Sequence, residues 1–361
     1  MRSPFTIALT NVPHFGQASQ HKLASTFSTS EEAWKANRNE LLGAGLTTAS
    51  VDAFLTWRAL HTPEEFVAKM AAKDIRLVSI HDPEYPPLLQ TIVDPPVFLF
   101  VRGELPQADR HHLAVVGSRH CTAYGRDVAK KLSFDLAKGG IVIVSGLAYG
   151  IDQSAHQGTM TAGGQTIAVL GSGLLGTDNS RHDRLVDEIL TSGGAVMSEF
   201  PLSAPPLAHH FPIRNRIVSG MCRATLIVEA GLPSGSMLTA QSAAEQNREV
   251  CAIPGPINAP TSAGTNTLLK DGAHLITEAR DIFELFGMNV APSASATSTL
   301  PAGRSNEEEA FFAVLGAEPM HIDIAAEKAG LSVVTASIVA TQLEVFGFIE
   351  DRGGKRYIRK Q

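Results

Sequence analysis

The sequence predicts an α/β protein built on a doubly wound, mainly parallel sheet, and three observations lead to that class. Between residues 110 and 288, an apolar run, a glycine-rich turn and an amphipathic segment recur every ~25 to 40 residues, which is the alternation of strand and helix. The apolar runs do not alternate with polar residues, as is typical of parallel strands covered by helices on both faces. The chain has 361 residues, 44% hydrophobic and 18% charged, so it is long enough for more than one domain with a buried core.

Residues 1–70 precede this pattern and are expected to form a small helical domain, because they are rich in helix formers and lack long β-branched runs. The turn from Asn11 to Gly16 is similar to that of a helix-hairpin-helix, in which glycine lets backbone amides approach a phosphate. A plain helix connector is the favoured alternative. Proline-punctuated, extended sequence follows from 75 to 105, and residues 97–101 are expected to form a strand that enters the main domain.

The main domain is expected to span residues 71–288. Its expected parallel strands are 113–116, 141–144, 166–170, 195–197, 224–228 and 250–253. In such a sheet, ligands bind outside the carboxyl ends of the strands, so the turns that follow these runs are the first place to look for a site.

Residues 289–304 are small, mostly uncharged residues with two prolines, and they predict a flexible linker. Residues 305–361 predict a winged-helix domain, with helices at 307–315, 322–329 and 333–345 and a hairpin that turns at Gly353-Gly354. The third helix carries no Lys or Arg, which is a poor surface for reading DNA bases. Protein contact, weak phosphate contact and specific duplex reading therefore all stay open, ahead of a purely structural role. The basic residues lie in the hairpin and tail: Arg352, Lys355, Arg356, Arg359 and Lys360.

The charge balance excludes a protein whose whole surface attracts polyanions. Thirty Lys and Arg stand against 36 Asp and Glu, a net charge of -6, so a nucleic-acid site must be local. Cys121, Cys222 and Cys251 are far apart and form no CxxC pair, which predicts neither disulfides nor a zinc site and fits a reducing compartment. We expect a cytoplasmic protein, because no apolar run is long enough to span a membrane and the N-terminus lacks the apolar core of a secretory signal.

Small residues follow three consecutive strands of the main domain. They are found in Val116-Gly117-Ser118-Arg119, in Ser145-Gly146-Leu147-Ala148-Tyr149-Gly150-Ile151-Asp152 and in Gly171-Ser172-Gly173. At one sheet edge they would form a shallow trough lined by backbone donors, which suits a phosphodiester. Arg119 offers a planar fork of donors to a phosphate, with a solvated arginine as the alternative. The spacing is not GxGxxG and no acidic residue ends the second strand, so ordinary NAD binding is disfavoured.

Two further groups could add positive charge to this trough. One is Asn179, Arg181, His182 and Arg184, which alone would be a solvated loop. The other is Phe211-Pro212-Ile213-Arg214-Asn215-Arg216, where Phe211 could stack on a base and the arginines could contact phosphate. Pairing of Arg214 or Arg216 with Glu199 or Glu229 is an equal alternative, and one arginine in each role is a third option.

Catalytic constellations are sparse in this sequence. It has no GxSxG elbow, HExxH motif or P-loop, and Cys121 beside His120 and the pair His209-His210 each lack a third member for a triad or metal set. Asp152 fits a helix cap better than a base. No metal or cofactor is expected.

Taken in order, the motifs of the main domain resemble the DprA family, also called Smf, the DNA-processing proteins of natural transformation. The similarity rests on the three turns above together with Ala155-His156, Ser198-Glu199-Phe200-Pro201, Phe211 to Ile217, Val228-Glu229-Ala230 with Ser234-Gly235-Ser236, Pro254-Gly255 with Gly264-Thr265-Asn266, and Asp271-Gly272-Ala273. The flanks are similar in kind to the helix-hairpin-helix or SAM-like and winged-helix modules of some members.

The resemblance implies an extended Rossmann-like domain that binds single-stranded DNA without sequence preference, forms a homodimer, protects incoming strands and loads RecA recombinase past single-strand-binding protein. It implies no enzymatic turnover. By position, Arg119 would grip a phosphate, and Gly117, Ser118, Ser145 and Gly146 would line the same pocket.

The chain departs from the family after the third strand. Many members have Tyr-Pro, a short spacer, Asn and a basic residue where this chain has Gly176-Thr177-Asp178-Asn179-Ser180-Arg181, so the second phosphate contact stays open between Arg181 and Arg184. The alternative function is a nucleotide-binding or nucleoside-monophosphate-cleaving enzyme of the related Rossmann-like superfamily. It is disfavoured because the stretch from Ser234 to Gln241 lacks a catalytic Glu.

Overall fold

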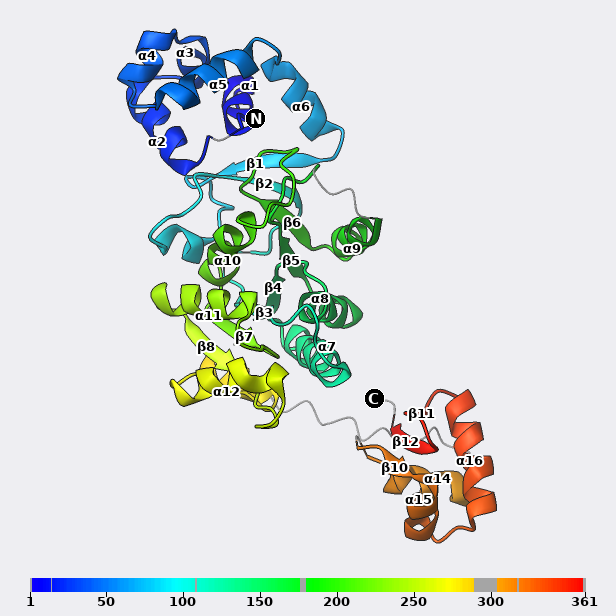
Figure 1. Ribbon diagram of the computed structural model, residues 1–361. Helices are drawn as coiled ribbons and strands as arrows, with labels where there is room; N and C mark the ends of the chain where they lie inside the picture. The colour runs from blue at the N-terminus through cyan, green and yellow to red at the C-terminus, as the bar shows by residue number, and fades with distance from the viewer. Residues whose placement is uncertain are drawn as a thin grey trace. The chain divides into compact units, whose positions relative to one another are not determined.

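The computed structural model describes residues 2–13, 15–107, 109–175, 180–288, 304–316 and 318–359. Its internal contacts divide the chain into two compact units, Met1–Val290 and Ala291–Gln361 (Figure 1). Of the expected linker at 289–304, only Arg304 lies within the described residues, and Asn179 lies outside them.

A mainly parallel sheet forms the centre of the first unit. Within the described residues its order is β1-β2-β6-β5-β4-β3-β7-β8-β9. Strands β3 to β9 pair in parallel, whereas β1 and β2 run antiparallel at one edge. The predicted α/β class is confirmed. The strands are β1 Ile75–Ser79, β2 Phe98–Gly103, β3 His112–Val116, β4 Val142–Ser145, β5 Thr166–Val169, β6 Ala195–Ser198, β7 Ala224–Ile227, β8 Glu249–Ala252 and β9 His274–Leu275.

Helices cover both faces of this sheet, and Figure 1 shows α7 and α8 on the side opposite α10 and α11. Strand β3 illustrates why both faces need cover: Leu113 and Val115 pack with α7, α8 and α13, whereas Ala114 and Val116 pack with α10 and α11. The helices of this layer are α7 Ala123–Lys138, α8 Ile151–Thr161, α9 Ser180–Thr191, α10 His210–Gly220, α11 Gly235–Glu245, α12 Ala263–Lys270 and α13 Ala279–Leu285, with short 3-10 turns at η1 Pro87–Thr91 and η2 Pro260–Ser262.

The chain reverses its direction across the sheet between β3 and β7. From β3 the strands proceed through β4 and β5 to β6, and the chain then returns to place β7 on the other side of β3. In doubly wound sheets, such a reversal opens a crevice at the carboxyl ends of the two neighbouring strands, and ligands bind there. The turns after β3 and β7 are therefore the natural frame for a site.

The N-terminal helices pack directly onto this sheet, and hydrophobic packing crosses the expected domain boundary at residue 70, which itself stays a prediction. Phe54 and Trp34 belong to one buried cluster with Phe100 of β2 and Leu202. The Asn11–Gly16 turn is also tied to the sheet domain, because Asn11 Oδ1 accepts from the Leu202 amide at 2.8 Å. This favours the plain connector over a phosphate-binding turn. The helices are α1 Pro4–Thr10, α2 Gln17–Thr26, α3 Ser30–Lys35, α4 Arg38–Gly43, α5 Thr48–Arg58 and α6 Pro63–Ala71.

The second unit is a winged helix with its own core. Phe311, Ala325, Leu343 and Tyr357 belong to one buried cluster, so each element contributes to it. No single described helix is long and apolar enough to cross a membrane; α15 and α16 meet that hydropathy only together, across a 106° bend. The elements are α14 Asn306–Val314, β10 Met320–His321, α15 Ile322–Ala329, α16 Val333–Val345, β11 Ile349–Asp351 and β12 Arg356–Arg359, with strand order β10-β12-β11.

Candidate nucleic-acid interface

The crevice between β3 and β7 is closed by one residue, Glu229, which follows β7. Its backbone oxygen accepts from the Ser118 amide at 2.7 Å. Its carboxylate accepts from the Thr122 amide at 2.9 Å and from the Thr122 hydroxyl at 3.3 Å. The two ends of the turn after β3 are therefore both held by Glu229.

Arg119 lies inside this turn and is exposed to solvent. Its guanidinium carbon lies 4.8 Å from the centre of the Phe211 ring, at the start of α10. The ring reaches this place because Gly171, after β5, has no side chain: a Cβ there would come within 3.0 Å of Phe211. Arg119 thus presents a cation on an aromatic face, an arrangement that fixes the guanidinium plane while leaving its donors available.

Arg214, expected as a possible phosphate contact at the surface, is buried. Its guanidinium donates to the carbonyl oxygens of Gly146, at 2.6 Å, and Val169, which are acceptors at the ends of β4 and β5. Burial lowers the pKa of Arg214 to about 10. The side chain ties two strand ends together, which favours a structural role, and its expected phosphate contact stays a prediction.

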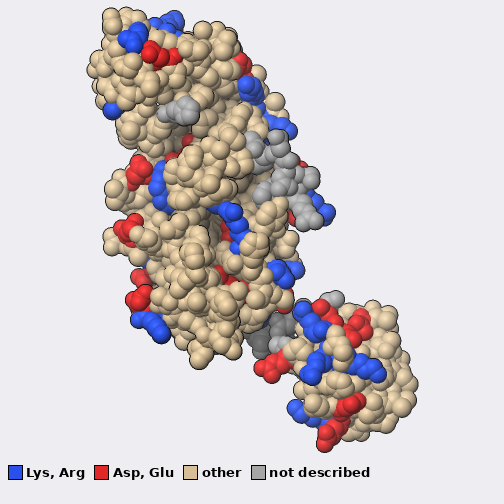
Figure 2. Space-filling model, in the orientation of Figure 1, with Lys and Arg blue, Asp and Glu red and all other residues tan. Residues whose placement is uncertain are grey.

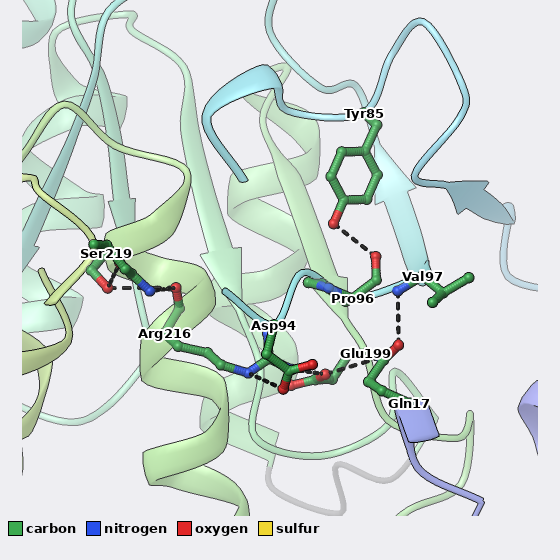
Figure 3. A network of polar contacts seen from close by, with 9 residues as sticks. Gln17, Tyr85, Asp94, Pro96, Val97, Glu199, Arg216 and Ser219 are labelled. Carbon is green, nitrogen blue, oxygen red and sulfur yellow. Dashed lines mark hydrogen bonds and ion pairs between the residues drawn. The ribbon is translucent and has the colours of Figure 1, made fainter. Parts of the chain in front are cut away.

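Arg216 is also unavailable to a phosphate, since it forms ion pairs within the protein. Its Nη2 pairs with Glu199, and its Nε lies 3.7 Å from Asp94 (Figure 3). Glu199 is nearly buried, and burial raises the pKa of its carboxyl although Arg216 opposes the shift. The structure thus pairs Arg216 with Glu199, as the expected alternative has it, and its phosphate contact stays a prediction.

The same network joins the N-terminal helices to the sheet. Gln17, the first residue of α2, donates to Glu199 at 3.3 Å and accepts from the Val97 amide at 2.8 Å. Figure 3 shows Gln17, Glu199 and Arg216 meeting from three segments distant in the sequence. The Gln17 amide and the Arg216 guanidinium both donate to Glu199 Oε2, which offsets part of the cost of burying this carboxylate.

Several backbone donors of the predicted trough are engaged within the protein, and the trough as a phosphate site stays a prediction. The amides of Gly146 and Ala148 donate to Asp152, at 3.0 and 3.3 Å. The expected helix cap at Asp152 is wrong, because the N-cap of α8 is Gly150 and Asp152 instead holds the loop before the helix. The His120 amide donates to Ser118 Oγ at 3.1 Å. Ser145 is fully buried and its hydroxyl donates to the Val115 carbonyl, so it lines no surface.

Packing also accounts for two of the glycines. A Cβ on Gly117 would lie 2.6 Å from the Ile151 side chain of α8, and one on Gly146 would lie 2.4 Å from Arg214. These positions need glycine because helix and guanidinium approach the backbone closely, whether or not a ligand binds.

The third candidate group is only partly described. Arg184 is exposed on α9 and pairs with Glu188 at 2.9 Å. It also lines an open groove with Lys130 of α7 and Gln157 of α8. These neighbours belong to the helices on that face of the sheet. Asn179 and the side chain of Arg181 lie outside the described residues, so the choice between Arg181 and Arg184 stays open.

Two exposed tyrosines near the Arg119 turn were not singled out as site residues from sequence. Tyr124 is the second residue of α7, and Tyr149 precedes Gly150, where a Cβ would lie 2.5 Å from the Ser118 carbonyl oxygen. Exposed aromatic rings beside a cation are typical of surfaces that stack unpaired bases. Each tyrosine directly precedes a glycine, Gly125 or Gly150, and this was the signal in the sequence that could have identified them.

Basic groups are sparse around this site. On the face drawn in Figure 2, Lys and Arg of the first unit form small separate groups among uncharged surface. In the winged helix, Arg359 donates to the carbonyls of Phe312 and Ala313, so it supports the fold, whereas Lys355 and Arg356 are exposed. Among the described side chains, no three His, Cys, Asp or Glu are grouped to hold a metal ion.

Comparison with known proteins adds family evidence to this geometry. The family model described as DNA recombination-mediator protein A matches residues 76–287, and that of the DprA winged helix domain matches 293–355. Protein Smf of Escherichia coli is 41% identical over 310 residues, which cover 84% of this chain and 83% of that protein.

Two solved structures are also similar. The X-ray structure of DNA processing protein A from Streptococcus pneumoniae has a TM-score of 0.66 and 32% identity, and the match covers 80% of this chain and 99% of that one. A structure that describes the single-stranded DNA binding mode of DNA processing protein A from Helicobacter pylori has a TM-score of 0.52 and 28% identity, covering 58% of this chain and 95% of that one.

Proposed function

Because the chain belongs to the DprA/Smf family of DNA recombination mediators, we propose that it binds single-stranded DNA through the Arg119–Phe211 surface. The relative from Helicobacter pylori, whose structure concerns single-stranded DNA binding, supports this ligand. An unpaired strand offers both chemistries that the surface matches: a phosphate for the guanidinium and a base for the aromatic ring.

The observation that carries the proposal is the exposed cation on an aromatic face at the switch point of the sheet. Arg119 contacts no carboxylate among its described contacts, unlike Arg184 and Arg216, so its donors are directed to solvent. Base stacking on an aromatic ring contributes about 1–3 kcal/mol per base and tolerates any sequence. Tyr124 and Tyr149 would extend the stacking surface on either side of the turn.

In the cell, this binding would protect incoming strands and allow RecA to load onto DNA coated by single-strand-binding protein during natural transformation and homologous recombination. We also propose a homodimer, because two modest sites on one strand raise affinity without any new kind of contact. A non-catalytic role fits a site whose polar atoms are engaged in holding turns.

Arg119→Ala tests the DNA contact. We expect affinity for a fluorescent oligo-dT to fall about tenfold or more, because a charge-assisted contact contributes about 1.5–3 kcal/mol. The slope of log affinity against log salt should flatten by about 0.7, the value for one phosphate contact on a single strand. Fluorescence anisotropy at several salt concentrations measures both quantities.

Arg110→Ala is the matched control, because Arg110 is an exposed arginine that precedes β3, at the opposite edge of the sheet. It should leave the affinity and the slope unchanged. Equal losses for both variants, or none for Arg119→Ala, would overturn the proposed site.

The mediator role requires a separate assay. With DNA coated by single-strand-binding protein, the wild type should accelerate RecA filament formation and Arg119→Ala should not. Binding of oligo-dT without any such acceleration would limit the function to strand protection.

A further inference from the structure

Glu229 occupies the place at which a doubly wound sheet ordinarily receives a ligand. It is 5% exposed, follows β7, and faces the turn after β3 across the switch point. In dinucleotide-binding folds, backbone amides at this turn and at the helix that follows it hold phosphates. Here the carbonyl oxygen of Glu229 takes the Ser118 amide and its carboxylate takes the Thr122 amide.

This double contact spans the segment that carries Arg119. Ser118 and Thr122 lie on either side of it, one and three residues away, and both are bonded to Glu229. A loop fixed at both ends has few conformations left to lose when its central side chain binds a ligand. The position of the Arg119 guanidinium over Phe211 therefore depends on Glu229.

Gly125 provides an independent indication that this contact is built into the fold. It is the third residue of α7, where glycine still favours the helix less than alanine does. A Cβ at this position would lie only 2.0 Å from Glu229 Oε2. Glycine thus stands at the helix position that the Glu229 carboxylate approaches, where a Cβ would clash with that carboxylate.

We propose that Glu229 is the positioning residue of the DNA site: its carbonyl oxygen takes the Ser118 amide, its carboxylate takes the Thr122 donors as an internal anion, and together these contacts hold Arg119 against Phe211. This inference rests on the proposed function of Arg119. It adds that the turn after β3 shapes a surface for a DNA strand and does not receive the phosphates of a nucleotide.

The sign of the effect separates positioning from simple electrostatics. Removing a negative charge near a DNA site should strengthen binding by Coulomb attraction alone. Loss of positioning should weaken it. Glu229→Ala should therefore lower oligo-dT affinity at least fivefold, whereas Glu229→Gln, which keeps a side-chain acceptor for the Thr122 donors, should retain wild-type affinity or exceed it.

A double-mutant cycle tests whether Glu229 acts through Arg119. In the Arg119→Ala background, Glu229→Ala should cause less than a twofold further loss, because the group that it positions is already absent. Circular dichroism and a urea unfolding curve for each variant identify any loss of folded protein, and affinities are calculated per folded molecule.

Gly125→Ala gives a second route to the same contact without changing any charge. Its added methyl group should displace the carboxylate and lower affinity at least threefold, although alanine favours the helix. Gly43→Ala is the matched control, because Gly43 also lies in a helix and a Cβ there meets nothing within 4 Å. It should not change binding.

The outcomes distinguish this inference from the proposed function. If Arg119→Ala binds as the wild type does, the DNA site itself is wrong. If Arg119→Ala is weakened but Glu229→Ala is not, or if the two losses multiply fully in the double variant, only the positioning role of Glu229 is overturned.

Discussion

Three arginines near the strand ends have three different surroundings, and these decide what each can do. Arg119 lies on an aromatic ring and is exposed, Arg214 is buried against strand carbonyls, and Arg216 is paired with Glu199. A guanidinium that is buried against carbonyls or paired with a carboxylate inside the protein cannot also bind a phosphate without breaking those contacts. Positive charge near a proposed DNA site is therefore evidence for it only where the donors are free.

The Arg216–Glu199 pair should be important for stability. Arg216→Ala leaves a buried carboxylate with its main partner removed, so we expect the free energy of unfolding to fall by about 3 kcal/mol. Arg184→Ala removes an exposed pair with Glu188 and should change it by less than about 0.5 kcal/mol. Urea unfolding followed by circular dichroism measures the free energy of unfolding of both variants. Similar losses for both would show that the buried Arg216–Glu199 pair stabilises the protein no more than an exposed pair does.

His156 should make stability depend on pH. It is fully buried in α8, its Nδ1 lies 2.7 Å from Thr166 Oγ1, and burial lowers its pKa to about 3. The unfolded chain takes up this proton near pH 6.5 and the folded protein does not, so stability is full above pH 6.5 and falls as the pH decreases, by about 1.4 kcal/mol per unit. Between pH 7 and 5, the wild type should lose about 2 kcal/mol more than His156→Asn in urea unfolding. Equal changes in the free energy of unfolding of the wild type and His156→Asn between pH 7 and 5 would contradict this prediction.

At the scale of elements, the contact between α7 and α8 sets the spacing of the helical layer. A Cβ on Gly158 of α8 would lie 2.1 Å from the backbone oxygen of Lys130 in α7, and backbone cannot move aside as a side chain can. Gly158→Ala should therefore destabilise the protein by about 1–3 kcal/mol, although alanine favours helix. Its melting temperature should fall, whereas that of Gly43→Ala should stay or rise. A stabilised Gly158→Ala variant would show that the helices can separate at little cost.

The elements themselves were largely predictable from sequence. Each of the six strands expected in the main domain appears within about a residue or two of its expected ends, because an apolar run covered on both faces leaves a clear pattern. The short strands β9 and β10 were missed, since two residues carry no periodicity.

The site was predictable only in part, for a geometric reason. Arg214 and Arg216 are two residues apart in α10, so their side chains point roughly 200° apart around the helix, and the sequence alone does not say which one faces the sheet. The free amides of the turns could not be counted either, because their acceptors, Glu229 and Asp152, lie far away in the chain or on the next helix. Arg119 and Phe211 were identified because each stands beside a glycine turn or a chain reversal.

At the scale of the whole molecule, the net charge of -6 limits how DNA can be held. A chain with more acidic than basic groups attracts a polyanion weakly at long range, so binding must depend on local contacts and stacking. This agrees with the few free cations near the β3 turn and with the separate basic groups in Figure 2.

The two compact units make the contribution of the winged helix measurable. The sheet unit and the winged helix have separate buried clusters, so a chain that ends at residue 290 should fold, with the urea midpoint of the sheet unit unchanged. Helix α16 has no Lys or Arg and exposes Val334, Ile338 and Val345, which suit protein contact better than phosphate contact. Of the exposed hairpin cations, Arg352 pairs with Glu350 at 3.5 Å, which leaves Lys355 and Arg356. Removal of the unit should therefore flatten the salt slope for oligo-dT by no more than about 1.4, two contacts at 0.7 each. Arg119→Ala in the shortened chain should still lower the affinity about tenfold. A decrease in the salt slope larger than about 1.4 on truncation would place the main DNA contact in the winged helix instead. The loss of the Arg119→Ala effect in the shortened chain would have the same meaning.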